Sequence, residues 1–264
     1  MGDRQISNIQ PSNSGDTRGR GSSSTLISFD NVSKTFPDGT HAVDNVSLNV
    51  EPGQFMTVVG PSGCGKSTLL RMGSGLLPVS EGEVRRSEGN LGYVFQDATL
   101  LPWRTVQKNV ELFCELRGLE RGERRQRAKD AIDLVGLSGF NRHYPAALSG
   151  GMRMRVSLAR SLTLDPPLFF FDEPFGALDE ITREYLNLEL LRIFAHAGFG
   201  AVFITHNLYE AVFLSTDVLV MSSRPGRILK SFQVPFPYPR DLDLRFDPAF
   251  AELTGEVSEV LRDE

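Results

Sequence analysis

The chain of 264 residues contains few of the features that mark secreted, membrane-spanning or nucleic-acid-binding proteins. Its two cysteines, Cys64 and Cys114, cannot build a disulfide framework, so a reduced cytosolic setting is expected. No run reaches the roughly 18 consecutive apolar residues that a membrane-spanning helix needs, and no apolar run follows Arg4 as in a secretory signal. The net charge of -5 argues against a nucleic-acid partner.

Large apolar side chains are also scarce in residues 1–24, which consist mainly of Ser, Gly, Asn, Asp and Arg. Such a segment cannot bury enough apolar surface to offset the entropy of ordering, so we expect a disordered tail. An inert extension is favoured over a regulatory arm. The folded domain is therefore predicted to comprise residues 25–264, a length at which a chain forms a sizeable core.

The remainder of the chain alternates between strand and helix patterns. Apolar alternation in 26–29 and 42–50, across a turn at 37–39, predicts an antiparallel β region. Short apolar runs separated by helical patterns predict parallel strands in βαβ units. The expected strands are 55–59, 91–95, 169–172 and 201–205, the expected helices are 68–76 and 181–197, and a hairpin of 218–222 and 227–232 precedes a helix that starts at Asp247.

A second helical pattern interrupts this alternation. Val106, Val110, Phe113 and Leu116 recur at helical spacing. We therefore predict a mostly helical subdomain, inserted at about residues 97–160. The predicted fold class is α/β, with an antiparallel β subdomain and an inserted α-helical subdomain.

A phosphate-binding loop follows the predicted strand 55–59 and opens a helix. Its glycines let backbone N–H groups approach phosphate oxygens closely, and the helix N-terminus adds positive partial charge. Lys66 is placed to reach the β- and γ-phosphates, and the Ser67 hydroxyl can bind Mg²⁺. The loop consists of Gly60, Pro61, Ser62, Gly63, Cys64, Gly65, Lys66, Ser67 and Thr68. The pattern predicts ATP and Mg²⁺ as cofactors.

Two acids end the apolar strand at 169–172. Asp172 can hold Mg²⁺ through water, and Glu173 can then orient or deprotonate an attacking water. An acidic pair after a strand could also begin an ordinary loop. Because the pair accompanies a phosphate-binding loop, the functional interpretation is favoured.

Two further side chains are expected at the same edge of the sheet. His206 follows the predicted strand 201–205, so it can lie near the γ-phosphate and hold Glu173 in place. Gln96 follows strand 91–95 and can reach Mg²⁺ or the water, which makes it a candidate link between chemistry and motion. The remaining histidines are interpreted as structural, and they are His41, His143 and His196.

With the segment Leu148-Ser149-Gly150-Gly151 ahead of Asp172, the chain resembles the ATP-binding cassette (ABC) ATPases over about residues 27–262. The resemblance implies a P-loop NTPase core. It also implies that Ser149, Gly150 and Gly151 bind the ATP held by a second ATPase subunit in a head-to-tail dimer, identical or a sister chain. Phe36 is implied to stack on adenine, and 177–179 to form a dimer-contact loop.

Some segments resemble one importer branch, the ATPases of nitrate, sulfonate and taurine transporters. They are Met152, where Gln is commoner in the family, with 100–106, 223–228 and the end of the chain from Pro239. Activity is expected to persist with Met152. The branch implies uptake of a small anion, a separate multi-span permease, an extracytoplasmic solute-binding protein, and a peripheral place on the cytoplasmic face of the inner membrane. Trp103, with Leu100, Leu101 and Val106, is expected to form an apolar dock for the permease.

Two other functions share the nucleotide motifs. One is the ATPase of an exporter or lipoprotein-release complex, against which only the importer-like segments argue. The other is a soluble ABC ATPase that remodels macromolecules. Proteins of that kind typically carry two cassettes or a long coiled coil, and neither appears in this sequence.

Overall fold

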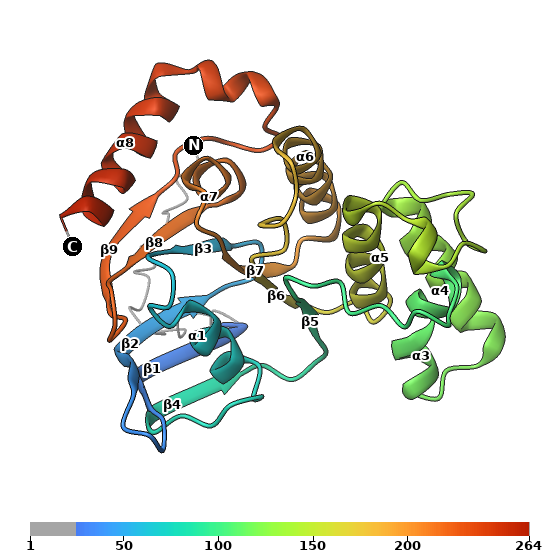
Figure 1. Ribbon diagram of the computed structural model, residues 1–264, viewed down its shortest axis with the longest axis horizontal. Helices are drawn as coiled ribbons and strands as arrows, with labels where there is room; N and C mark the ends of the chain where they lie inside the picture. The colour runs from blue at the N-terminus through green and yellow to red at the C-terminus, as the bar shows by residue number, and fades with distance from the viewer. Residues whose placement is uncertain (1–24, 264) are drawn as a thin grey trace, which may run out of the picture.

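A computed structural model describes residues 25–263, and the tail predicted at 1–24 lies outside the described residues. Figure 1 shows a three-stranded sheet below, a larger sheet through the middle and a group of helices to one side. The nucleotide motifs lie on the large sheet, so its strand order decides which of them meet.

The small sheet has the strand order β2-β1-β4 and is antiparallel throughout. Its strands are β1 (Ile27–Thr35), β2 (His41–Val50) and β4 (Glu81–Arg86). The predicted pairing of the first two is confirmed, with Phe29 opposite Leu48. Strand β4 was not predicted, because only Val84 of that strand is even half-buried and a single apolar residue gives no alternation.

The large sheet has the order β5-β6-β7-β3-β8-β9, with only the β8–β9 pair antiparallel. Its strands are β3 (Phe55–Val59), β5 (Leu91–Val94), β6 (Leu168–Asp172), β7 (Gly200–Ile204), β8 (Asp217–Met221) and β9 (Ile228–Gln233). The predicted parallel core and closing hairpin are confirmed. Because β3, β5, β6 and β7 are parallel, their carboxyl ends share one edge.

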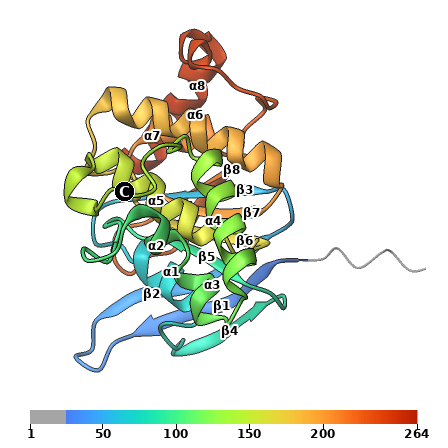
Figure 2. The same cartoon turned by 90° about the vertical axis from the view of Figure 1, so that its right-hand side faces the viewer.

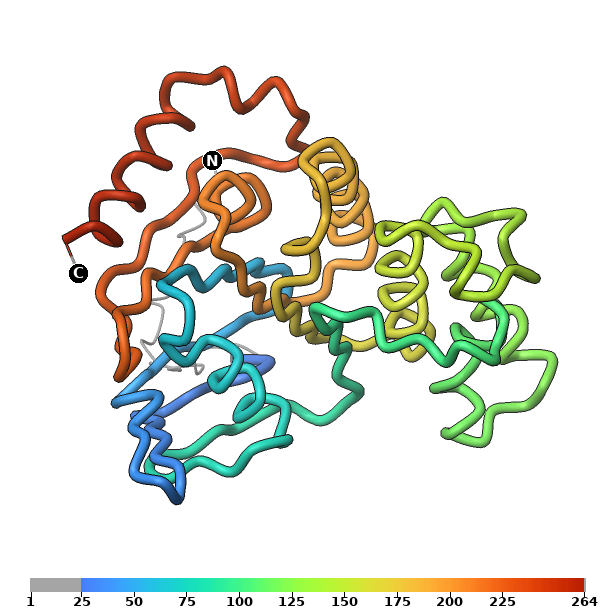
Figure 3. Tube along the Cα trace, in the orientation of Figure 1, coloured from blue at the N-terminus to red at the C-terminus, as the bar shows by residue number. Residues whose placement is uncertain are grey.

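Helices cover both faces of this sheet, as is usual for an α/β fold. They are α1 (Lys66–Gly73), α6 (Glu180–Ala197), α7 (Leu208–Leu214), the 3-10 turn η2 (Leu242–Phe246) and α8 (Pro248–Arg262). After β9 the chain, orange to red in Figure 3, passes α6, where Tyr238 packs on Phe194, and then returns in α8. Asp247 caps α8 by accepting a hydrogen bond from the backbone N–H of Ala249, as its position before a proline predicted.

Between β5 and β6 the chain forms α2 (Val106–Val110), α3 (Leu112–Leu116), α4 (Arg121–Leu134), the 3-10 turn η1 (Pro145–Ala147) and α5 (Gly150–Leu162). These helices lie toward the viewer in Figure 2. Among them, α5 packs on the large sheet, against β5. That about residues 97–160 form a subdomain of their own stays a prediction.

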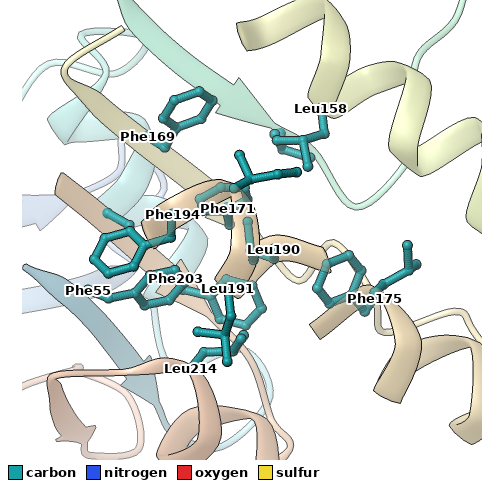
Figure 4. Packing of buried hydrophobic residues seen from close by; sticks show 14 of the residues in the cluster. Phe55, Leu158, Phe169, Phe171, Phe175, Leu190, Leu191, Phe194, Phe203 and Leu214 are labelled. Carbon is teal, nitrogen blue, oxygen red and sulfur yellow. The ribbon is translucent and has the colours of Figure 1, made fainter. Parts of the chain in front are cut away.

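The core beside the large sheet is rich in phenylalanine (Figure 4). Phe169 and Phe171 of β6 point to one face, where their rings stack with centroids 5.6 Å apart, whereas Phe170 points to the other face. This alternation follows from the period of two in a strand. All three rings are buried, so β6 reads as a continuous apolar run rather than an alternating one.

Gly92 of β5 tests how tightly this core is packed. A Cβ at this position would lie 2.4 Å from the ring of Phe169, which is itself wedged against Phe171 and Phe199. Gly92→Ala is therefore expected to lower the free energy of unfolding by about 1–3 kcal/mol. Gly122→Ala in α4 has open space and should raise it by about 0.5–1 kcal/mol. Denaturant unfolding of both variants measures this, and an unchanged Gly92→Ala midpoint would contradict it.

Candidate nucleotide site

The phosphate-binding loop connects β3 to α1, as predicted, and its shape requires glycine at Gly65. Gly65 is the N-cap of α1 with φ 113°, and a Cβ there would lie 2.5 Å from the carbonyl oxygen of Ala42. Only glycine combines that backbone conformation with so close an approach. The helix starts at Lys66, two residues earlier than the apolar pattern suggested, because this cap and not the first apolar side chain determines where it begins.

Lys66 lies almost buried under its own loop. Its ammonium donates hydrogen bonds to the carbonyl oxygens of Gly60, at 2.8 Å, and Pro61, at 2.9 Å. The charge is thus held at the centre of the loop by backbone acceptors. A phosphate oxygen can replace those acceptors at little cost in side-chain entropy, since the side chain is already ordered.

Three Mg²⁺ ligands were predicted, and two of them, Ser67 and Asp172, are hydrogen-bonded to each other. The Ser67 hydroxyl donates a 2.7 Å hydrogen bond to the Oδ1 atom of Asp172, at the carboxyl end of β6. The Tyr93 hydroxyl donates to Oδ2 of the same carboxylate at 3.4 Å. Burial, and after it the negative charge of Asp172, raises the pKa of Tyr93, so the phenol keeps its proton and remains a donor.

Glu173 and His206 come from neighbouring strands and form a pair. The Oε2 atom of Glu173 lies 3.1 Å from Nδ1 of His206. Glu173 has a left-handed backbone, with φ 47°, while its N–H donates to the carbonyl oxygen of Ile204. A left-handed conformation is uncommon for a glutamate and stores strain, which is one of the features found at functional sites. Here it directs the carboxylate toward the phosphate-binding loop.

A pocket of about 230 Å³ opens over these groups. It is lined by Phe36, Ala42, Ser62, Gly63, Gly65, Lys66, Ser67, Thr68, Glu173 and Arg224. Phe36 follows β1, is half-buried with the Lys34 ammonium 5.6 Å from its ring centroid, and lines the pocket with the rest of its ring. The structure therefore brings together the predicted aromatic residue, the phosphate-binding loop and the acidic residue. Arg224 was not predicted to lie in this pocket. It is 161 positions from Gly63 of the phosphate-binding loop, and no nucleotide motif includes it.

The other predicted site residues lie apart from this pocket. Gln96 is exposed just after β5 and does not line it. Ser149 is the N-cap of α5, where its hydroxyl accepts from the N–H of Met152 at 3.2 Å. Gly150 and Gly151 approach Leu178 and Thr182 of the following loop and helix. Residues 149–151 therefore sit at an anion-favouring helix N-terminus that is separate from this chain's own pocket.

A cluster of polar side chains centred on the buried Glu210 connects the residue before His206 with the loop at 177–179. Glu210 of α7 accepts a 2.5 Å hydrogen bond from the hydroxyl of Thr205, the residue before His206. Its other oxygen lies 3.9 Å from Nε of Arg183, which also donates to the carbonyl oxygen of Leu178 at 2.9 Å. Burial raises the pKa of Glu210. No sequence motif marks this group, because its members meet only when α6 and α7 pack together.

Comparison with known proteins supports the interpretation of this pocket as a nucleotide site. The family model of ABC transporters matches residues 43–176. An ABC transporter ATP-binding protein of Methanocaldococcus jannaschii is 43% identical over 248 residues, which cover 90% of this chain and 92% of that one. A taurine import ATP-binding protein of Rhizobium johnstonii is 43% identical, covering 84% of this chain and 89% of that one. An aliphatic sulfonates import ATP-binding protein of Bacillus cereus is 40% identical, covering 88% and 94%.

Solved structures agree with the sequence relatives. The dimeric structure of a bacterial ABC transporter cassette superposes with a TM-score of 0.71 at 31% sequence identity, covering 80% of this chain and all of that one. The same cassette in a dimeric post-hydrolysis state, bound to ADP and inorganic phosphate, gives the same TM-score. The predicted P-loop NTPase fold is thus confirmed. The chain belongs to the ABC transporter family, as one of its ATP-binding cassettes.

Proposed function

We propose that this chain hydrolyses ATP as the energising subunit of an ABC importer that takes up a small anion. The observation that carries the proposal is that Lys66, Ser67 and Glu173 line one pocket, with Asp172 hydrogen-bonded to Ser67 and His206 in contact with Glu173. The names of the relatives favour taurine or an aliphatic sulfonate as the anion. Nitrate, the other anion of that branch, has no such support.

ATP would be held by its base and by its phosphates. Phe36 lines the pocket and would stack on adenine, while the loop N–H groups, the N-terminus of α1 and Lys66 would bind the phosphates. Ser67 and Asp172 are already within hydrogen-bond distance, and hydroxyl and carboxylate oxygens suit Mg²⁺. They would hold the ion together with Gln96, which must approach from its exposed position. When bound, the ion neutralises charge on the phosphates.

Glu173 is the general base in this proposal, and His206 positions it. The 3.1 Å contact orients the carboxylate when Nδ1–H of His206 donates to it, and a second hydrogen bond from Nε2 toward the γ-phosphate would require the imidazole to carry a proton on both nitrogens. Phosphoryl transfer requires little covalent chemistry from the protein, so positioning and electrostatic stabilisation account for most of the rate. The strained backbone at Glu173 is consistent with such a preorganised base.

A second ATPase subunit completes the site. Ser149, Gly150 and Gly151 do not line the pocket of their own chain, yet they form a phosphate-compatible helix N-terminus. In a head-to-tail dimer, identical or with a sister chain, they would bind the ATP of the partner. The solved relative at 31% identity is a dimer, which supports this arrangement.

The remaining partners are a permease and an extracytoplasmic solute-binding protein. No helix in residues 25–263 has the length and apolar character needed to cross a membrane. As for the relatives named as import ATP-binding proteins, the proposal includes a separate multi-span permease, with this chain bound peripherally at the cytoplasmic face of the membrane. The exporter alternative is not favoured by the relatives, and no nucleic-acid partner is proposed.

The permease is proposed to dock on the loop before α2. Trp103 is 71% exposed there. The buried Asn109 fixes the loop, since its amide donates to the carbonyl oxygens of Leu101, Arg104 and Thr105. One part of the predicted dock is wrong: Val106 is fully buried as the first residue of α2, so it supports the loop and cannot touch a partner.

Trp103→Ala is expected to reduce co-purification with the permease at least several-fold, because a large exposed aromatic side chain is a common binding hot spot. ATP hydrolysis by the isolated chain should stay within about twofold of wild type, since Trp103 does not line the pocket. Leu116→Ala, on the equally exposed apolar residue of α3, is the matched control. Intact permease binding and transport in the Trp103 variant would contradict the docking proposal.

Solute uptake tests the whole proposal. Cells whose only copy carries Glu173→Gln would be compared with wild type for taurine, alkanesulfonates, nitrate and pyrimidine-type vitamin precursors. Selective loss of one solute supports the importer and identifies its substrate. Normal uptake of the whole panel, in cells where the variant protein is present, would count against import of these anions. Purification of the chain with its membrane partners would then show what it energises.

A further inference from the structure

The tip of the β8–β9 hairpin packs against the nucleotide pocket. The N–H of Gly226 donates to the carbonyl oxygen of Ala42 at 3.0 Å, and the N–H of Asp44 donates back to Gly226 at 3.0 Å. A Cβ at Gly226 would lie 2.3 Å from the carbonyl oxygen of Cys64, inside the phosphate-binding loop. The tip is therefore held by backbone contacts to both β2 and the phosphate-binding loop.

This packing places Arg224 on the rim of the pocket. Its Nε–H and an Nη2–H donate to the carbonyl oxygen of Gly63, at 3.2 and 2.8 Å, and its side chain lines the pocket beside Lys66 and Phe36. The pKa of Asp38, just beyond Phe36, is held below its usual value by the N–H and hydroxyl of Thr40 and, to a smaller extent, by Arg224. The guanidinium thus shares the pocket lining with both Phe36 and the phosphate-binding loop.

The chemistry of the side chain suits a polyphosphate. A guanidinium stays charged at any physiological pH and carries five N–H donors, so one anchored on a single carbonyl keeps donors for a second acceptor. Arginine is also the side chain best matched to phosphate oxygens. Lys66 is the other cation lining the pocket, and Glu173 is an opposing negative charge. A second cation would offset that charge when a nucleotide binds.

We propose that Arg224 is a nucleotide-binding residue, whose guanidinium is anchored on Gly63 and binds the phosphate groups of ATP and ADP. The proposal rests on the proposed ATPase function and extends its binding site to the β8–β9 hairpin. It assigns a role to part of the segment at 223–228, which the sequence analysis linked only to an importer branch. The competing account is that Arg224 merely clamps the phosphate-binding loop.

Nucleotide binding to the full chain separates the two accounts. Dissociation constants for ATP, ADP and adenosine would be measured for wild type, Arg224→Gln and Arg224→Lys at low and high salt. Arg224→Gln should weaken ATP and ADP by about 10-fold, as for a partly screened charge-assisted hydrogen bond, and leave adenosine unchanged. Arg224→Lys should recover part of the loss. The difference should shrink as salt screens the exposed charge.

Arg227→Gln is the matched control. Arg227 lies at the same tip and carries the same charge, but it pairs with Asp44 and does not line the pocket. Its variant should bind ATP as wild type does. Unchanged ATP and ADP affinity in Arg224→Gln would overturn the proposal, and so would an equal loss for adenosine, because a clamp acts on the whole pocket. Failure of the wild-type chain to bind ATP would refute the proposed function itself.

Discussion

Glu173→Gln is expected to slow ATP hydrolysis by about 100-fold or more while ATP still binds. Loss of a general base typically costs a factor of about 10²–10⁴. Glutamine keeps the size of the side chain but cannot accept the proton of the attacking water. It also replaces the carboxylate that contacts His206 with a neutral amide, which weakens that contact. Binding should persist because Lys66 and the loop N–H groups are unchanged.

Turnover, equilibrium ATP binding and oligomeric state would be measured on the same Glu173→Gln sample. With hydrolysis blocked, saturating Mg-ATP should accumulate a dimer, visible by light scattering. Glu259→Gln, an exposed acid on α8, is the control and should behave as wild type. Near-normal turnover would remove Glu173 from the role of base. A strict monomer at saturating Mg-ATP would contradict the shared site that residues 149–151 are proposed to complete.

Lys66→Ala is expected to abolish turnover and to weaken ATP binding by at least about 10-fold. The ammonium is held at the centre of the loop by two backbone carbonyls, and hydrogen bonds from a charged donor contribute about 1.5–3 kcal/mol each. Its loss also leaves those carbonyls of Gly60 and Pro61 without the cation they now contact. Direct ATP titration measures the affinity.

The two variants should differ in assembly. ATP should dimerise Glu173→Gln but not Lys66→Ala, since only the former retains the bound nucleotide that joins the subunits. Lys129→Ala, on the exposed face of α4, controls for the loss of a positive charge. A thermal melt would show that Lys66→Ala is folded. Wild-type ATP affinity in a folded Lys66→Ala chain would mean that Lys66 does not bind phosphate.

Much of the fold could be predicted because its signals are local. Each of these signals lies in a few consecutive residues, as in the apolar runs of β3, β6 and β7 and the helix start at Asp247. Strand β4 was missed for the opposite reason: it is exposed on nearly every residue, and only its pairing with β1 makes it a strand. Exposed edge strands carry little sequence pattern, since no face of theirs is deeply buried.

The sequence by itself determined the family and the order of the nucleotide motifs, because each motif is a short run whose backbone and side chains act together. Tertiary structure alone decided which distant residues complete them. Tyr93 meets Asp172 because β5 pairs with β6, Arg224 reaches the pocket because Gly226 packs on Cys64, and residues 149–151 are excluded from it. Such contacts depend on strand order and close backbone packing, which leave no fixed spacing in the sequence.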